Sequence, residues 1–242
     1  MFNYIVNIFN ILLYKPLFNF LVLLYNYVPG HDFGISIILL TLVIRFILYP
    51  LSLKAVESQK NIQRVQPKIK EIQEKYKDNK EKQAKEILEV YKTEKINPFG
   101  GLLFPIIQLP ILIALYQVFW QGLNPQELLN LYSFVSNPGH INSMFLGVID
   151  LSKPNAIIAI LSGLAQYYQT KMLLPKKDRS KTGKDSDFSR IMQTQMTYFL
   201  PVFTIIILFG LPSALGVYWT ASGIFSIVQQ YFILKKPEEK KL

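Results

Sequence analysis

Long apolar runs alternate along this chain with short, strongly charged ones. A helix needs about 20 apolar residues to cross a hydrocarbon core of about 30 Å, because each residue adds about 1.5 Å. Each of the five runs approaches or reaches that length, which predicts an all-α, polytopic membrane protein with five transmembrane helices. The runs are residues 33–53, 98–120, 154–174, 191–209 and 213–234.

Residues 1–29 are also apolar and aromatic, but Lys15-Pro16 interrupts them. Because proline inside a helix removes a hydrogen bond and kinks the backbone, a straight span across this point is the less favoured interpretation. We expect residues 1–29 to be an amphipathic segment in the membrane interface, with a helix from Leu17 onward and Tyr25 and Tyr27 at headgroup level. A kinked extra span is the alternative. No cleaved signal peptide is expected, because a basic start and a small-residue cleavage site are missing.

Residues 54–95 are rich in Lys, Glu and Gln. Apolar residues recur at helical spacing on both sides of a turn signal at Asp78-Asn79, which predicts two antiparallel helices. Pro67 is expected in the first turn of its helix, where a missing N–H is tolerated. The apolar seam is thin, so we expect the hairpin to move relative to the spans. The seam residues are Ile69, Ile72, Tyr76, Ala84, Ile87, Leu88 and Tyr91.

The connecting segments differ in charge. The loop at 121–153 has no Lys or Arg before Lys153, whereas the hairpin, the loop at 175–190 and the tail at 235–242 are basic. Basic segments remain in the cytoplasm. Five spans place all three basic segments on that side, with the N-terminus outside and the C-terminus in the cytoplasm.

Arg45 lies inside the first predicted span. A charge at the bilayer centre costs about 2.5–3.5 kcal/mol on insertion scales, so an intramembrane arginine is expected to face water or protein. None of the predicted spans contains Asp or Glu. The alternative is a structural arginine bound to backbone carbonyls, but the missing counter-charge favours an arginine available to a passing ligand.

Other polar residues within the spans also fall on helical faces. Thr41, Arg45, Tyr49 and Ser52 follow i, i+4, i+8 and i+11 spacing, which is one face of a helix. Such faces either line a polar groove or bond helices to one another. Similar candidates in later spans are Gln108, then Ser162, Gln166, Gln169 and Thr170, then Trp219, Ser222, Ser226 and Gln229.

Composition narrows the choice of function. The chain has no cysteine and two isolated histidines, His31 and His140, so no metal site or thiol chemistry is expected. No sequence motif of a hydrolase, a phosphate-binding loop or a dinucleotide-binding fold is present, so neither an enzyme nor a cofactor is expected. The net charge of +10 accompanies the membrane topology and does not indicate DNA binding.

Four segments together resemble the YidC/Oxa/Alb family of membrane protein insertases, in its short, five-span bacterial form. They are GISIILLTLVIRFILYPLSLKAVES at 34–58, the charged hairpin ending near Lys95, NPFGGLLFPIIQLPILIALYQVF at 97–119 and PSALGVYWTASGIFSIVQQ at 212–230. The match extends over residues 13–234. It is specific because the four segments occur in the same order at similar spacing.

The resemblance implies five helices around a hydrophilic groove that is open to the cytoplasm and to lipid. There the groove receives hydrophilic segments of nascent integral membrane proteins, inserts them and helps them fold, without a cofactor, alone or with the Sec translocon. It implies a bacterial plasma (inner) membrane location and assigns Arg45 and Trp219 to the groove. The groove set that we predict is Arg45, Thr41, Tyr49, Ser52, Gln108, Gln166, Gln169 and Trp219.

The resemblance also implies that the hairpin captures substrates and that the second cytoplasmic loop and the tail contact the ribosome. The alternative for the loop is a topological role with contact to anionic lipid of the bilayer. The basic residues concerned are Lys176, Lys177, Arg179, Lys181 and Lys184.

Some features depart from the family pattern. Many relatives have Tyr-Trp-x-x-Ser-Asn in the last span, where this chain has Gly223 in place of the asparagine. A lipoprotein signal is not expected without cysteine.

Two rival functions are a small-solute or anion channel or transporter, and a scaffold that only binds partners. The channel predicts an internal repeat or a second intramembrane charge to complete a path, and we find neither a repeat nor such a charge near the middle of another span.

Overall fold

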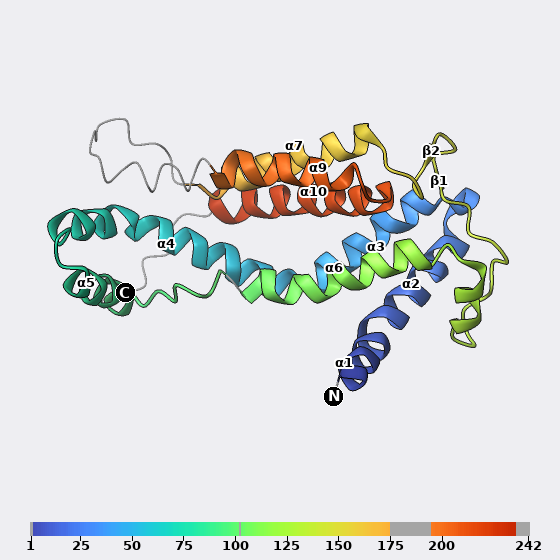
Figure 1. Cartoon of the computed structure of the whole chain (residues 1–242), viewed down its shortest axis with the longest axis horizontal. Helices are drawn as coiled ribbons and strands as arrows, with labels where there is room; N and C mark the ends of the chain where they lie inside the picture. The colour runs from blue at the N-terminus through green and yellow to red at the C-terminus, as the bar shows by residue number, and fades with distance from the viewer. Residues whose placement is uncertain (1, 102, 175–194, 236–242) are drawn as a thin grey trace.

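The computed structural model of the chain describes residues 2–101, 103–174 and 195–235. Its helices form an elongated bundle with the α4–α5 hairpin at one end and the β1–β2 loop at the other (Figure 1). The elements in chain order are α1 (Phe2–Phe9), η1 (π, Asn10–Tyr14), α2 (Lys15–Tyr27), η2 (3₁₀, Pro29–His31), α3 (Phe33–Ile47), α4 (Tyr49–Lys75), α5 (Lys80–Thr93), α6 (Leu103–Gln121), η3 (3₁₀, Pro125–Asn130), β1 (Met144–Phe145), β2 (Ile149–Asp150), α7 (Ala156–Met172), η4 (π, Gln195–Phe199), α9 (Leu200–Leu208) and α10 (Ser213–Lys235).

The N-terminal helix continues through Lys15-Pro16, where the sequence predicts an interruption. Elements α1, η1 and α2 follow one another without a loop. The π turn allows this, because the Lys15 N–H bonds to the Asn10 carbonyl five residues earlier and Pro16 then occupies the first turn of α2. The expected start of the helix at Leu17 is therefore wrong, whereas a location in the interface stays a prediction.

The first predicted span, residues 33–53, is broken. Helix α3 ends at Ile47, and α4 begins at Tyr49 after a bend of 66°. Pro50 explains the break, because it has no N–H to donate to the Phe46 carbonyl and it occupies the first turn of α4. Helix α4 then runs without interruption to Lys75.

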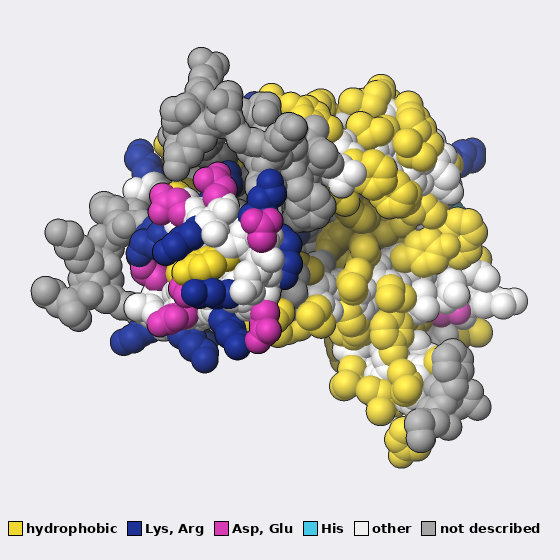
Figure 2. Space-filling view, turned by 60° about the vertical axis from the view of Figure 1, so that its left-hand side comes forward, with side chains coloured by type: hydrophobic (Ala, Val, Ile, Leu, Met, Phe, Trp, Pro, Cys, Tyr) yellow, Lys and Arg dark blue, Asp and Glu magenta, His cyan; other side chains and the backbone are white. Residues whose placement is uncertain are grey.

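The hairpin of α4 and α5 has a small core of its own. Val65, Ile69 and Ile96 are buried in it, and Ile62, Ile87, Val90 and Tyr91 pack against them. Pro67 lies inside α4 rather than in its first turn, because the helix starts much earlier than the sequence predicts. Leu88 of the predicted seam is 54% exposed. Charged side chains gather on the hairpin surface in Figure 2.

Helix α6 begins at Leu103, after the predicted start at Pro98. The Asn97 side chain accepts a hydrogen bond from the Phe99 N–H at 2.9 Å, and the Asn97 carbonyl accepts one from the Gly100 N–H at 3.2 Å. These bonds form a turn, and the helix follows it.

Helices α7, α9 and α10 pack closely beside one another (Figure 1). Glycines permit this approach. A Cβ added to Gly163 of α7 would lie 2.4 Å from Ile205 Cγ1 of α9, and one added to Gly216 of α10 would lie 2.5 Å from Ile158 Cγ2 of α7. Small residues at helix contacts are a common feature of membrane proteins.

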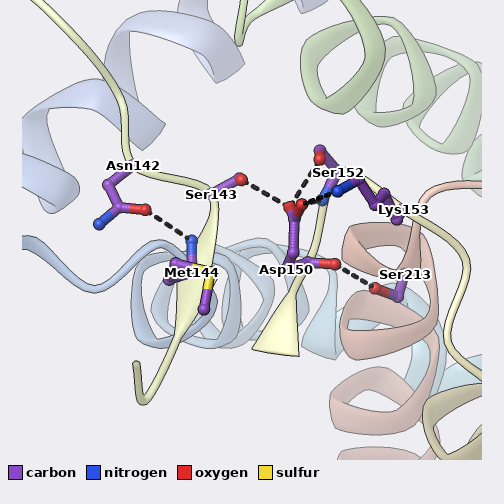
Figure 3. A network of polar contacts seen from close by, with 7 residues as sticks. All are labelled: Asn142, Ser143, Met144, Asp150, Ser152, Lys153 and Ser213. Atoms are coloured by element: carbon purple, nitrogen blue, oxygen red, sulfur yellow. Dashed lines mark hydrogen bonds and ion pairs between the residues drawn. The ribbon is translucent and has the colours of Figure 1, made fainter. Parts of the chain in front are cut away.

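The β1–β2 loop joins the start of α10 through Asp150, a residue in the loop that the sequence predicts between the second and third spans (Figure 3). Its Oδ1 atom accepts hydrogen bonds from Ser143 Oγ at 2.7 Å and from Ser152 Oγ at 2.6 Å, and its Oδ2 atom pairs with Lys153 Nζ at 3.2 Å. The Ser213 N–H donates to the Lys153 carbonyl at 3.0 Å, which satisfies one of the free N–H groups at the start of α10.

The bundle interior changes from apolar to polar along its length. Near the β1–β2 loop it is filled by residues such as Phe33, Phe119 and Leu215, none more than 2% exposed. Farther along α3 and α10 many of the buried residues are polar, namely Thr41, Arg45, Ser222, Ser226, Gln229 and Gln230. Ordinary hydrophobic packing therefore holds one half of the bundle, and hydrogen bonds are needed in the other.

By length and composition, two of the described helical segments suffice to cross a membrane, Tyr4–Tyr27 and Leu103–Gln121. The bent pair α3–α4 makes a third if it counts as one span, and Thr197–Leu208 is apolar but shorter. The chain is thus an all-α membrane protein, and the count of five spans stays a prediction. Helix α10 has the length, but its buried polar residues reduce its hydropathy.

We predict that Gly163→Leu lowers the free energy of unfolding by about 1–3 kcal/mol, because the new side chain has to displace Ile205. Thermal unfolding of the protein in detergent measures this. The matched control is Gly210→Leu, since the nearest atom to a Cβ there is the Ile207 carbonyl oxygen at 3.6 Å. Equal melting temperatures for the two variants would contradict the packing of α7 on α9.

A second prediction concerns how the stability contributed by Asp150 changes with pH. Hydrogen bonds from Ser152 and Ser143 hold the pKa of Asp150 well below its usual range. A lowered pKa stabilises the fold fully above the usual aspartate pKa of about 3.9, and this contribution is lost progressively as the pH falls from there through the lowered pKa of the folded state. Asp150→Asn should therefore cost about 1–2 kcal/mol at pH 7 and measurably less at pH 3. Thermal unfolding at both pH values tests this, and an equal difference at each would refute it.

Candidate functional site

The Arg45 side chain lies inside the bundle and is 7% exposed. One Nη2 N–H donates to Ser222 Oγ of α10, and the guanidinium lies over the Phe104 ring of α6, 5.4 Å from its centroid. Its Nε and Nη1 atoms are buried and have no hydrogen-bond partner among the residues that the structure describes. The ion pairs among the described residues do not include Arg45.

More polar groups surround this position. Ser52 of α4 donates to Gln229 Oε1 of α10 at 2.7 Å, and Gln108 Nε2 of α6 donates to the Tyr218 hydroxyl of α10. Both amides are only partly satisfied, since Gln229 Nε2 and Gln108 Oε1 have no partner among the described groups. We define the polar interior as Arg45, Ser52, Gln108, Tyr218, Ser222, Gln229 and Gln230.

The bend at Leu48 divides the predicted stripe of the first span. Thr41 is buried but donates to the Ile37 carbonyl of its own helix at 2.6 Å. Tyr49 lies beyond the bend and is 39% exposed. The structure thus brings Arg45 and Ser52 to the same helix, α10, and leaves Tyr49 at the surface.

The candidates of the third and fifth spans gather in a different place. Gln166 of α7 accepts a hydrogen bond from Thr204 of α9 at 2.5 Å, and together with Trp219 these residues line an apolar cleft of about 200 Å³. Ser162 bonds to the Gly216 carbonyl at 2.9 Å. Gln169 is half-buried on α7. Ser162 and Gln166 therefore bond helices to one another, and none of the hydrogen bonds found between described residues joins this group to Arg45.

The predicted groove set omits Tyr218, Ser222 and Gln229, which the structure places in the polar interior, although Ser222 and Gln229 are among the polar residues that the sequence marks in the last span. A signal for them exists in the sequence, because Tyr218, Ser222, Ser226 and Gln229 have i, i+4, i+8 and i+11 spacing. This is the spacing of the stripe that contains Arg45. The predicted face contains Trp219 together with Ser222, whereas in the structure Tyr218 lies with Ser222 in the polar interior.

Several candidates lie outside the described residues, namely Lys176, Lys177, Arg179, Lys181 and Lys184. Among the residues that the structure does describe, no group of His, Cys, Asp and Glu could hold a metal ion. The polar interior offers hydrogen-bond donors and one positive charge. It therefore suits carboxylate, carbonyl or hydroxyl groups as ligands.

Comparison with known proteins gives consistent matches. The sequence model of the family described as 60Kd inner membrane protein matches residues 23–240. A membrane protein insertase YidC of Fusobacterium nucleatum is 32% identical over 226 residues, which are 93% of this chain and 98% of that protein. One from Clostridium tetani is 33% identical over 212 residues, 88% of this chain and 86% of that one.

Another relative is longer. A membrane protein insertase YidC of Wolinella succinogenes is 35% identical over 227 residues, which are 94% of this chain but 38% of that protein. The family model covers most of the chain, and the shorter relatives align over nearly their whole length. The chain therefore belongs to the family of the 60Kd inner membrane protein, the YidC-type membrane protein insertases.

Proposed function

We propose that the chain inserts integral membrane proteins through a hydrophilic groove built on the polar interior between α3, α6 and α10. Hydrophilic segments of the substrate enter beside Arg45, and its apolar segments leave sideways into lipid. The observation that carries this proposal is the buried Arg45 guanidinium, two of whose nitrogen atoms have no partner, and which makes no ion pair with a carboxylate, in the described part of the chain.

A guanidinium inside a membrane costs several kcal/mol of free energy unless water or a ligand contacts it, about 2.5–3.5 kcal/mol on insertion scales. A permanent carboxylate partner would satisfy it but would also block a substrate. An incoming acidic or carbonyl-rich segment supplies the missing acceptors and in return loses less hydration than it would in lipid. The membrane potential, about 2.3 kcal/mol per charge per 100 mV, then pulls an acidic segment outward.

The topology that we propose has five spans, formed by α3, α6, α7, η4 with α9, and α10. It places the hairpin and the C-terminus in the cytoplasm and the N-terminus outside, in the plasma membrane of a bacterium. The positive-inside rule supports this, because the basic hairpin and the β1–β2 loop lie at opposite ends of the bundle (Figure 1). The apolar packing near the β1–β2 loop is what a groove closed toward the outside requires.

The proposed partners are nascent integral membrane proteins, the ribosome and the Sec translocon, together with the lipid bilayer. In this scheme the hairpin makes an early contact with the substrate. Its surface carries both signs of charge, with Glu94 paired to Lys68 at 2.5 Å and to Arg64 at 3.2 Å. Substrates of mixed charge are suited to such a surface.

The rival function, an anion channel or transporter, would also use Arg45. It needs further charges to continue a path across the membrane. Along the described helices of the bundle, Arg45 is the charged residue that lies in the interior, and the other buried polar groups are neutral. Flux through protein-containing liposomes, measured beside insertion, separates the two functions.

We predict that Arg45→Ala lowers the insertion of substrates with an acidic translocated segment by about tenfold, which corresponds to about 1.4 kcal/mol. Arg45→Lys should restore most of the activity, because it retains the charge. The measurement is insertion of a small single-span substrate into liposomes, with a protected acidic segment as the readout.

Lys153→Ala is the matched control, since Lys153 is exposed at the end of the bundle opposite the hairpin and pairs with Asp150. It should insert the same substrate nearly as well as the unaltered protein. Full activity of Arg45→Ala on several acidic substrates would refute the role of the charge, and anion flux that depends on Arg45 would favour the channel.

The basic loop leads to a separate prediction. Replacing Lys176, Lys177 and Lys181 with Gln should weaken ribosome binding, and the binding that remains should vary less steeply with salt, because fewer phosphate contacts are made. Co-sedimentation with ribosomes at several salt concentrations measures both effects. Unchanged binding would assign the loop to topology and contact with anionic lipid.

A further inference from the structure

A second polar cavity lies where the N-terminal helix meets the end of α6 and the 3₁₀ turn η3. Its volume is about 270 Å³, and it shares no residue with the polar interior around Arg45. Element η1 packs against α6 beside it. The residues that line it are Asn10, Tyr14, Lys15, Gln117, Gln121, Glu127 and Asn130.

One cation and one anion line this cavity without neutralising each other. Glu127 Oε2 accepts hydrogen bonds from the Tyr14 hydroxyl at 2.9 Å and from Asn130 Nδ2 at 3.2 Å. No donor among the described residues reaches Glu127 Oε1. Lys15 takes part in none of the ion pairs found in the described part of the chain. The cavity therefore offers a fixed carboxylate oxygen and a separate ammonium group.

The amides in the lining are similarly available. No hydrogen bond joins the side chains of Asn10, Gln117 or Gln121 to other residues within the described ranges. Polar groups on a cavity wall that lack protein partners bond to water or to a ligand. A ligand with both a negative and a positive group would satisfy the lining better than water alone.

The surroundings of the cavity are those of a lipid interface. Helix α1 exposes apolar side chains, among them Tyr4 at 77% and Ile5 at 63%. On α6, Tyr116 and Trp120 stack with ring centroids 5.9 Å apart and are 36% and 58% exposed. Exposed aromatic residues at the end of a membrane helix mark the headgroup level. Gln117 and Gln121 of the cavity follow these aromatic residues directly in the sequence, so the cavity lies at the same level along α6.

We propose that this cavity binds the phosphoethanolamine headgroup of a phospholipid in the outer leaflet. Lys15 contacts the phosphate, Glu127 accepts hydrogen bonds from the primary ammonium, and the amides bind the remaining phosphate oxygens. A choline headgroup has no N–H to donate to Glu127, and a glycerol headgroup has no positive charge for it. The assignment goes beyond insertion and depends on the proposed topology only for the choice of leaflet.

The test is native mass spectrometry of the purified protein with an equimolar mixture of phosphatidylethanolamine, phosphatidylcholine and phosphatidylglycerol that have identical acyl chains. We expect phosphatidylethanolamine to be retained about tenfold over phosphatidylcholine, or about 1.4 kcal/mol. Glu127→Gln should abolish this preference, although the glutamine side chain can still accept the hydrogen bond from the Tyr14 hydroxyl. Lys15→Gln should weaken retention of all three phospholipids.

Lys153→Gln is the control, because Lys153 is exposed near the same end of the bundle and does not line the cavity. It should retain the preference.

Soluble phosphoethanolamine should compete at least about tenfold less well than the lipid, since it lacks the acyl chains that contact α1. Equal competition would overturn the lipid assignment, and a preference that is absent or survives Glu127→Gln would overturn the site. The Arg45→Ala protein serves as a further control, because it should keep the preference whether or not it inserts substrates.

Discussion

The Arg45 guanidinium is buried with no carboxylate partner among the described residues, and this is the constraint on which the rest of the structure depends. A charge in this position has to be held by neutral groups, and Ser222 with the ring of Phe104 supplies them. These two contacts come from α10 and α6, so the arginine brings three helices together at one point. The polar residues along α10 then have a structural reason, since hydrophobic packing cannot hold the bundle where its interior is charged.

The two halves of the bundle divide the work of stability and function. Near the β1–β2 loop, closely packed apolar residues and the bonds of Asp150 fix the helices relative to one another. In the half toward the hairpin, several buried amide atoms lack partners, and each of these costs stability unless water or a ligand reaches it. Sites that bind transient ligands commonly have this division, with a rigid scaffold next to an underfilled polar region.

Much of the fold is readable from the sequence because membrane helices need long apolar runs, and turns need proline, glycine and asparagine. The runs at 154–174 and 213–234 correspond closely to α7 and α10. The bend at Leu48 is harder to predict, because proline is tolerated in membrane helices and only the surroundings decide whether it breaks one. The π turn before Pro16 is harder still, since it depends on a single shifted hydrogen bond.

The site around Arg45 can be predicted from the sequence less completely than the fold. The position of Arg45 follows from its charge in an apolar run, but its neighbours depend on how α10 is rotated about its axis. A rotation of one residue exchanges Trp219 for Tyr218, and periodicity alone does not distinguish the two faces when both carry aromatic and polar residues. Tertiary contacts between α3 and α10 decide it, and these join residues that are far apart in the chain.

The unbroken course of α4 has a mechanical consequence. Ser52 lies near the start of this helix, and the residues that pack against α5 lie toward its end. Its 27 residues extend about 40 Å. Ser52 holds Gln229 of α10, and Gln63, midway along α4, donates to the Leu173 carbonyl at the end of α7. The hairpin and the polar interior are thus joined by one continuous helix that is also bonded to α7, so a tilt of α4 would shift Ser52 relative to Gln229 near Arg45.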